Sequence, residues 1–340
     1  MTSLRALLHR RRALLRAAAA VLVALVLLLL VLHAVPPGEL WETLSSVQPG
    51  LLGLAALAAF AFICARAWRY ALLLRADRPG DPRTILAVTL ASWGVNLLLP
   101  GPGGDAAFVV LARRRLNTPP VVGVGAAVLS RLLDVSSLLL IALVTAPLAG
   151  VALHRVALIA GLGLALLIAL GLTALFWSWS RQVIVRWLER LPLPPSIHNP
   201  LHYAIEELGS GSRPRLLVLA TVAARVATGL QYLALFAAIG QPISLVGVWF
   251  ALSIRTLLLA VPIQGIGGLG TTQLWWTAAL TLLGWPAEDA LAASLAVHLV
   301  DLFVSLPQAA IGWALLGFSA PEPAAREQVA AAARAVSGRD

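Results

Sequence analysis

The stretch "NLLLPGPGGDAAFVVLARRR" at residues 96–115 interrupts an apolar segment with two prolines and three glycines, and it places a carboxylate, Asp105, directly after the break. Seven uncharged residues and then three consecutive arginines follow. Eight residues, 105–112, cannot cross a bilayer as a helix, because a span takes about 20 residues. Arginines favour the cytoplasmic side of a membrane. The pattern therefore predicts a re-entrant helical hairpin that enters from the cytoplasm at residue 84, breaks, and returns.

The composition restricts the class of protein. Apolar residues make up 60% of the chain, charged residues 12%, and the mean hydropathy is +0.89. A soluble domain carries about 25% charged residues. We therefore expect an all-α polytopic membrane protein. The net charge is +10, and the basic residues lie between apolar segments. Membrane topology explains this distribution, so no nucleic acid is expected as a partner. The single cysteine, Cys64, excludes an intrachain disulfide.

The arginines also predict how often the chain crosses the membrane. All 25 basic residues are arginines. In the topology predicted here, 19 of them lie on the cytoplasmic side, one lies outside and five lie within spans. Both termini are then cytoplasmic, in the cytoplasmic (inner) membrane of a bacterium. Six full spans and two re-entrant hairpins are predicted, with the spans at 17–35, 51–74, 119–148, 156–177, 214–239 and 287–316.

Residues 1–340 are expected to form one membrane domain. Residues 178–213 are the largest polar insertion, and they begin with the amphipathic run "RQVIVRWLERL", which is typical of a helix on the membrane surface. We expect this insertion and the tail at 320–340 to be cytoplasmic.

The two halves of the chain resemble each other. "NLLLPGPGGD" (96–105) resembles "RTLLLAVPIQGIGGLGTTQ" (255–273), and "SRLLDVSSLLL" (130–140) resembles "VHLVDLFVSLP" (297–307). From Asp105 to Arg131 is 26 residues, and from Gln273 to His298 it is 25. Residues 84–148 and 244–316 are therefore predicted to form an inverted-topology repeat, which places a binding site between broken helices. The alternative is that any two glycine-broken apolar segments look alike.

Ionisable residues within spans are costly and usually functional. Arg131 and Asp134 lie three residues apart, as do His298 and Asp301, so each pair shares a helix face. The alternative is that both are structural ion pairs. The candidate substrate-binding residues are Arg66, Arg69, Asn96, Asp105, Arg131, Asp134, Arg225, Arg255, Gln273, His298 and Asp301.

The arginines within spans predict an anion site. If Arg131, Arg225 and Arg255 converge, their planar guanidinium groups suit phosphate. For Arg225, snorkelling or pairing with Asp105 or Asp301 is an alternative. Arg66 and Arg69 either snorkel to the headgroup layer or contact a lipid phosphate.

The remaining motifs do not indicate catalysis. "GIGGLG" at 265–270 matches a dinucleotide fingerprint, but no strand precedes it. Helix N-termini near Asp105 and Thr271 could direct their positive dipole ends at an anion. With no metal-ligand pattern and no nucleophile–base pair visible, we expect no enzyme, no catalytic or metal-binding residue, and no cofactor.

With "LLLPGPGGD", "SRLLD", "GIGGLGTTQ" and "VHLVDL", the chain resembles the lysylphosphatidylglycerol synthase transmembrane (flippase-like) family over roughly residues 15–316. It departs from the family at Gln273, where Glu is usual, and at His298, where Arg is common. We expect no cytosolic aminoacyltransferase domain after the membrane region.

The resemblance implies a flippase-like transporter that moves an anionic lipid headgroup by alternating access. The candidate lipids are a modified phosphatidylglycerol, a polyprenyl-phosphate-linked sugar and a hopanoid-type lipid. Two alternatives are a membrane-embedded enzyme of lipid or glycan synthesis and a lipid-binding scaffold. Besides the anionic lipid, the partners considered are a second copy of the chain, in a homodimer, and enzymes of lipid or glycan synthesis.

Overall fold

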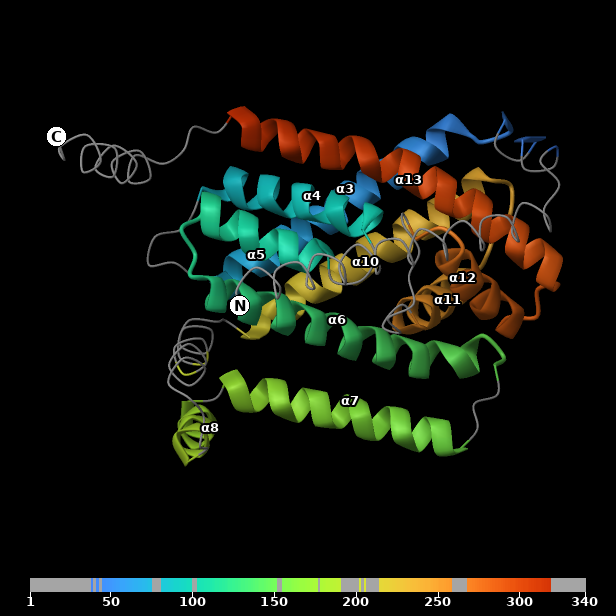
Figure 1. Ribbon diagram of the computed structural model, residues 1–340. Helices are drawn as coiled ribbons and strands as arrows, with labels where there is room; N and C mark the ends of the chain where they lie inside the picture. Colours follow the sequence, from blue (N-terminus) through green and yellow to red (C-terminus); the bar gives the residue numbers. More distant parts are fainter. Residues whose placement is uncertain are drawn as a thin grey trace, which may run out of the picture.

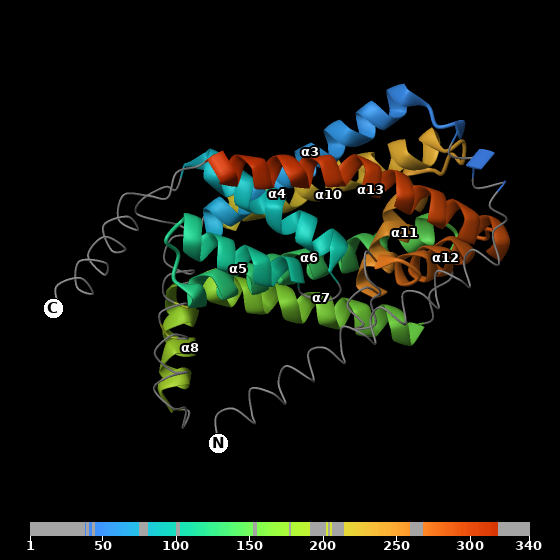
Figure 2. The same cartoon turned by 45° about the horizontal axis from the view of Figure 1, so that its top comes forward.

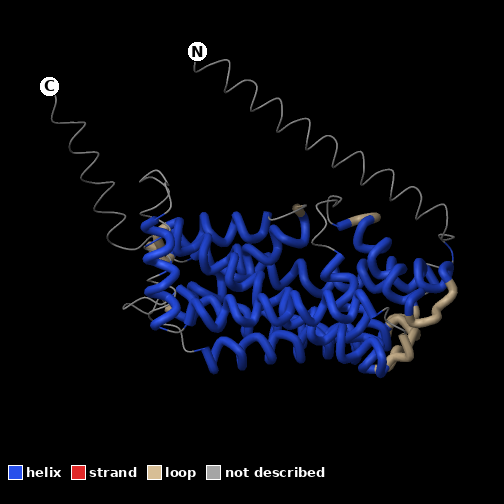
Figure 3. Tube along the Cα trace, turned by 90° about the horizontal axis from the view of Figure 1, so that it is seen from below, coloured by secondary structure: helices blue, strands red, loops and turns tan. Residues whose placement is uncertain are grey.

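The structure is a computed structural model that describes residues 38, 41–42, 45–74, 81–99, 103–151, 155–176, 178–190, 202, 205, 214–258 and 268–318. This described part is built of α-helices and contains no strand (Figures 1 and 3). The helices with defined bounds are α3 (Pro49–Leu74), α4 (Pro82–Leu98), α5 (Gly103–Arg115), α6 (Pro120–Leu148), α7 (Arg155–Phe176), α8 (Ser178–Arg190), α10 (Pro214–Ala238), α11 (Leu245–Leu258), α12 (Thr271–Leu282) and α13 (Ala287–Phe318).

Four of these helices, α3, α6, α10 and α13, are long and apolar enough to cross a membrane. They match four of the predicted spans, and α7 coincides with the span predicted at 156–177. The span predicted at 17–35 lies outside the described residues. The expectation of an all-helical chain with membrane-capable helices is therefore confirmed.

Two pairs of short helices lie where the sequence predicts breaks. Helix α4 ends at Leu98, and α5 begins at Gly103 and runs back along α4 (Figures 1 and 2). The two helices are in close contact near the break, since a Cβ on Gly104 would lie 3.0 Å from the Asn96 Cα atom. Helices α11 and α12 form the second pair, and they also pack against each other.

The buried apolar side chains form two main clusters, and each includes residues from both halves of the chain. The first includes Tyr70 and Phe108, whose rings stack with centroids 3.7 Å apart. The second surrounds the fully buried Trp276. Helix α10 contributes to both, with Leu217 in the first cluster and Phe236 in the second. Residues midway along α10 therefore lie between two apolar cores.

The start of the predicted polar insertion forms helix α8, which runs across the end of the helical bundle instead of along it (Figures 1 and 2). Most of the remaining insertion and the tail at 320–340 lie outside the described residues.

Candidate functional site

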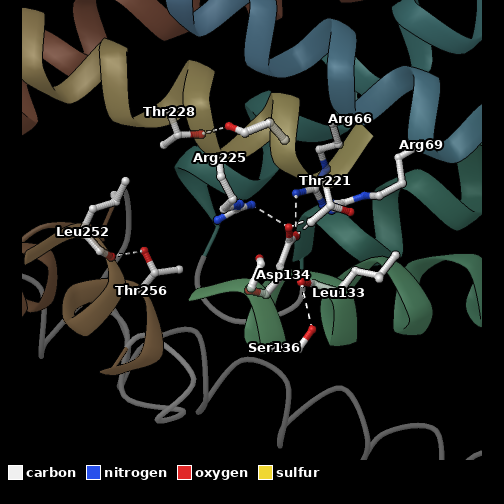
Figure 4. A network of polar contacts seen from close by, with 12 residues as sticks. Arg66, Arg69, Leu133, Asp134, Ser136, Thr221, Arg225, Thr228, Leu252 and Thr256 are labelled. Carbon is white, nitrogen blue, oxygen red and sulfur yellow. Dashed lines mark hydrogen bonds and ion pairs between the residues drawn. The ribbon is translucent and has the colours of Figure 1, made fainter. Parts of the chain in front are cut away.

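A buried carboxylate, Asp134 of α6, lies at the centre of a charge network between three helices (Figure 4). Arg69 of α3 donates two hydrogen bonds to it, with Nη1–Oδ1 and Nη2–Oδ2 distances of 2.9 and 3.0 Å. Arg225 of α10 donates another at 2.6 Å. The Nη1 atom of Arg66 lies 3.7 Å from Oδ2. Three guanidinium groups therefore surround one carboxylate.

Helical spacing brings the cations to this point. Arg66 and Arg69 lie three residues apart on α3, so both point toward α6 and α10, as Figure 4 shows. On α10, Thr221 lies one turn before Arg225, and its Oγ1 accepts a hydrogen bond from Arg69 at 3.5 Å. A charge within an apolar bundle is tolerated when it is paired and hydrogen-bonded. Asp134 thus links three helices that must pack together for it to be stable.

A second carboxylate, Asp105, lies in the first turn of α5, where the helix dipole favours a negative charge. Arg131 of α6 donates to its Oδ2 at 2.9 Å. Arg66 donates to its Oδ1 at 3.5 Å, and Arg66 therefore connects the two carboxylates. The Arg66 guanidinium also lies 5.5 Å from the Tyr70 ring centroid and 5.6 Å from the Trp93 ring centroid.

The network contains four arginines and two aspartates, so it carries two positive charges in excess. Exposure of the side chains falls along it, from 48% for Arg131 through 19% for Asp105 and 12% for Arg66 to 0% for Arg69. Arg131 is therefore the place where a ligand can reach the network without the bundle opening.

The surface around Arg131 is apolar. The residue lies roughly 16 Å along a helix of roughly 43 Å, with the exposed side chains of Val128 and Leu132 on either side. A cation within an apolar membrane surface is costly unless an anion or water meets it.

These contacts differ from the pairings considered from the sequence. Arg131 pairs with Asp105 and not with its helix neighbour Asp134. Arg225 pairs with Asp134, whereas Asp105 and Asp301 had been considered. The reason is that helix packing brings α3, α6 and α10 together, and it satisfies each buried charge across helices.

Arg66 and Arg69 point into the bundle, so the snorkelling expected as an alternative is wrong for both. Asn96 lies beside Gly104, at the end of α4 that faces Asp105. Whether any of these residues binds a ligand stays a prediction.

The remaining candidates lie in the second half of the chain. Asp301 of α13 accepts hydrogen bonds from Gln231 Nε2 (2.7 Å), Tyr232 Oη (2.9 Å) and Ser305 Oγ (3.2 Å). All three donors are neutral, and within the described residues Asp301 has no ion pair. The corresponding carboxylate of the first half, Asp134, has three arginines instead.

Arg255 of α11 does not hydrogen-bond to the first network. Its guanidinium lies 5.9 Å from the Tyr232 ring centroid and 5.7 Å from that of Trp276. Gln273 of α12 is fully buried, and among the described residues neither polar atom of its side chain has a hydrogen-bond partner. His298 lies against the start of α12, since a Cβ on Gly268 would be 3.6 Å from its Cε1 atom.

The family model described as "Lysylphosphatidylglycerol synthase TM region" matches residues 17–307. The chain belongs to this family. No curated protein and no solved structure matches it. Together with the four long apolar helices, this membership makes the chain a multi-pass membrane protein, and the family indicates a function connected with membrane lipids.

Several polar residues of this family member were not identified from the sequence. Gln231 and Tyr232 interrupt an apolar span in "GLQYLAL", and this interruption was the available signal. Thr221 and Tyr70 had no such signal, since each is one of many small polar or aromatic residues in the spans. Across the described ranges, no group of three His, Cys, Asp or Glu residues could hold a metal ion.

Proposed function

We propose that the protein is a flippase-like transporter that moves an anionic phospholipid headgroup across the bacterial cytoplasmic membrane. The observation that carries the proposal is the half-exposed guanidinium of Arg131, at the edge of a network with excess positive charge. Both termini are cytoplasmic in this proposal. The protein performs transport and catalyses no reaction.

A phosphate fits the free donors of Arg131. Asp105 occupies its Nη2 atom, and the side chain makes no other hydrogen bond within the described part of the chain. A guanidinium group has five N–H donors in a planar fork, and it binds phosphate through two parallel hydrogen bonds. A phosphate can therefore begin to bind the free N–H groups of Arg131 before it displaces Asp105.

The apolar surface around Arg131 favours a lipid over a soluble anion. Val128 and Leu132 would contact acyl chains on either side of the bound phosphate. A lipid that enters sideways from the bilayer keeps its chains in an apolar environment and brings only its headgroup to the network. A soluble anion would have to lose its water at an apolar surface.

The mechanism that we infer is alternating access between two inverted repeats, 84–148 and 244–316. In this scheme α4–α5 and α11–α12 are re-entrant hairpins that open from opposite sides, and six full spans surround them. A phosphate on Arg131 competes with Asp105, which keeps Arg66 as an alternative partner at 3.5 Å. Headgroup binding would thereby loosen α5 from α6 and favour movement of the first hairpin.

Transport of fluorescent phosphatidylglycerol in proteoliposomes tests the proposal. A membrane-impermeant quencher measures the exchange of acyl-labelled lipid between leaflets. We expect the wild type to exchange the lipid, Arg131→Ala to lose the activity, and Arg131→Lys to retain part of it, because an ammonium group cannot make the bidentate contact. Arg114→Ala is the matched control, since Arg114 is exposed at the end of α5.

Three outcomes would contradict the proposal. Wild-type exchange no faster than in empty liposomes would indicate a lipid-binding scaffold. A modified lipid product would indicate an enzyme. Equal exchange by the wild type and Arg131→Ala would mean that this arginine is structural.

A further inference from the structure

Gln273 is the polar side chain of the described structure that most clearly lacks a partner. It is 0% exposed, and neither its amide nitrogen nor its carbonyl oxygen makes a hydrogen bond with the described residues. Buried amide groups are almost always satisfied, because leaving them unpaired destabilises the fold. The residue is third in α12, which has twelve residues and follows Gly268 and Gly270, both with positive φ. An unpaired donor and an unpaired acceptor are therefore held at a helix N-terminus.

A cation lies one turn further along the same face. Trp276 is three residues after Gln273, and the two side chains share a helix face. The guanidinium of Arg255 lies over the Trp276 ring, at 5.7 Å from its centroid. Arg255 is partly exposed and has no ion pair within the described residues, unlike the four arginines of the first network.

The carboxylate of this region is already engaged. Asp301 accepts hydrogen bonds from Gln231, Tyr232 and Ser305. It is 5% exposed. What remains for a ligand is a cation, a neutral amide and the positive end of α12. Arg255 disfavours an ammonium group beside it, and the Gln273 amide favours a group that both donates and accepts hydrogen bonds.

We propose that Arg255, Gln273 and the start of α12 bind the hydroxyl-bearing part of an anionic lipid headgroup, and that they exclude headgroups carrying an amine. A hydroxyl group is both a donor and an acceptor, so it satisfies both atoms of the Gln273 amide. Glycerol and sugar headgroups share this chemistry. The inference rests on the proposed transport function, and it narrows the substrate to a phospholipid with free hydroxyl groups.

The site is closed in the structure described here. Because Gln273 is enclosed, a headgroup reaches it only when α11 and α12 separate, as alternating access requires. The partly exposed Arg255 is the first contact. A glutamate at position 273 would place a carboxylate there and attract an amine.

The selectivity of lipid exchange in proteoliposomes tests the inference. Four labelled lipids are compared: phosphatidylglycerol, phosphatidylinositol, phosphatidate, whose headgroup has no alcohol hydroxyl, and lysylphosphatidylglycerol, which has amines. The wild type should exchange the two hydroxyl-bearing lipids on the order of tenfold faster than lysylphosphatidylglycerol, and faster than phosphatidate. Faster exchange of phosphatidylglycerol would identify glycerol as the preferred headgroup, and faster exchange of phosphatidylinositol would identify a ring headgroup.

Gln273→Glu should lower the ratio of phosphatidylglycerol to lysylphosphatidylglycerol exchange on the order of tenfold, since like charges repel and opposite charges attract. Gln273→Leu should remove the preference for phosphatidylglycerol over phosphatidate. Gln241→Glu, in the exposed turn after α10, is the control and should leave all ratios unchanged.

Wild-type protein that exchanges lysylphosphatidylglycerol as fast as phosphatidylglycerol overturns this inference and leaves the transport function standing. Wild-type protein that exchanges none of the lipids overturns both. If Gln273→Glu does not insert into the membrane, the inference is tested by the ratios of lipid exchange rates of the wild type and of Gln273→Leu.

Discussion

Replacing Arg69 and replacing Arg131 should have different effects on stability and on lipid exchange, although each arginine binds an aspartate. Arg69 is fully buried, and it makes two hydrogen bonds to Asp134 and one to Thr221. Among the described residues, Arg131 makes one hydrogen bond, to Asp105, and its side chain is half-exposed. Replacing each by methionine, which preserves much of the apolar stem, separates a structural arginine from one available to a ligand.

The expected magnitudes follow from these contacts. Hydrogen bonds to charged groups contribute about 1.5–3 kcal/mol each, and breaking a buried ion pair by removing one partner costs about 3–5 kcal/mol. Asp134 keeps Arg225 and Arg66 after the loss of Arg69, so we expect Arg69→Met to lower the free energy of unfolding by about 3 kcal/mol, the lower end of that range. Arg131→Met should lower it by no more than about 1 kcal/mol, as for exposed pairs.

Reversible unfolding in mixed detergent micelles measures both values, and lipid exchange is measured on the same preparations. Arg131→Met should be nearly as stable as the wild type and inactive in exchange. The double variant Arg69→Met with Asp134→Leu should be less stable than Arg69→Met, because it leaves the buried Arg225 without its carboxylate. If Arg131→Met unfolds as easily as Arg69→Met, Arg131 is a structural residue and the assignment of the ligand site is refuted.

Three further predictions concern the hairpin, the topology and His298. Gly104→Val should destabilise the protein by about 1–3 kcal/mol through overpacking against Asn96, measured by unfolding, whereas Gly53→Ala, which has open space around it, should not. In a Cys64→Ser background, a membrane-impermeant thiol reagent should label Arg114→Cys from the cytoplasmic side and Glu288→Cys from outside; labelling of position 114 from outside would contradict the re-entrant hairpin. Lipid exchange should depend on pH in the wild type and less so in His298→Arg, whose side chain stays charged; identical profiles would show that no proton acts at His298.

The breaks in the helices were predictable, because proline and glycine act locally. The first hairpin was expected to break after residue 100 and resume at 105, and the structure ends α4 at Leu98 and begins α5 at Gly103. In the second, a helix was expected to begin near Thr271, and α12 begins at Thr271. Proline cannot continue a helix hydrogen-bond ladder and glycine weakens it, so the sequence alone carries this information.

The candidate residues were predictable as a set, but their partners were not. A charge in an apolar span must find a partner, and this rule selected Arg66, Arg69, Asp134 and Arg225. Their pairing depends on how α3, α6 and α10 pack, since Asp134 lies 65 residues from Arg69 and 91 from Arg225. The neutral donors around Asp301 were missed for a related reason: a tyrosine or glutamine in a span can point to lipid, to the core or to a carboxylate.

The measurement that tests the central claim most directly is an experimental structure of the protein in nanodiscs that contain phosphatidylglycerol. The account predicts a lipid phosphate within hydrogen-bond distance of the Arg131 guanidinium, with the acyl chains against Val128 and Leu132. A structure in which acyl chains alone or a second copy of the chain cover Arg131, with no phosphate beside it, would contradict the claim that this arginine receives a lipid headgroup.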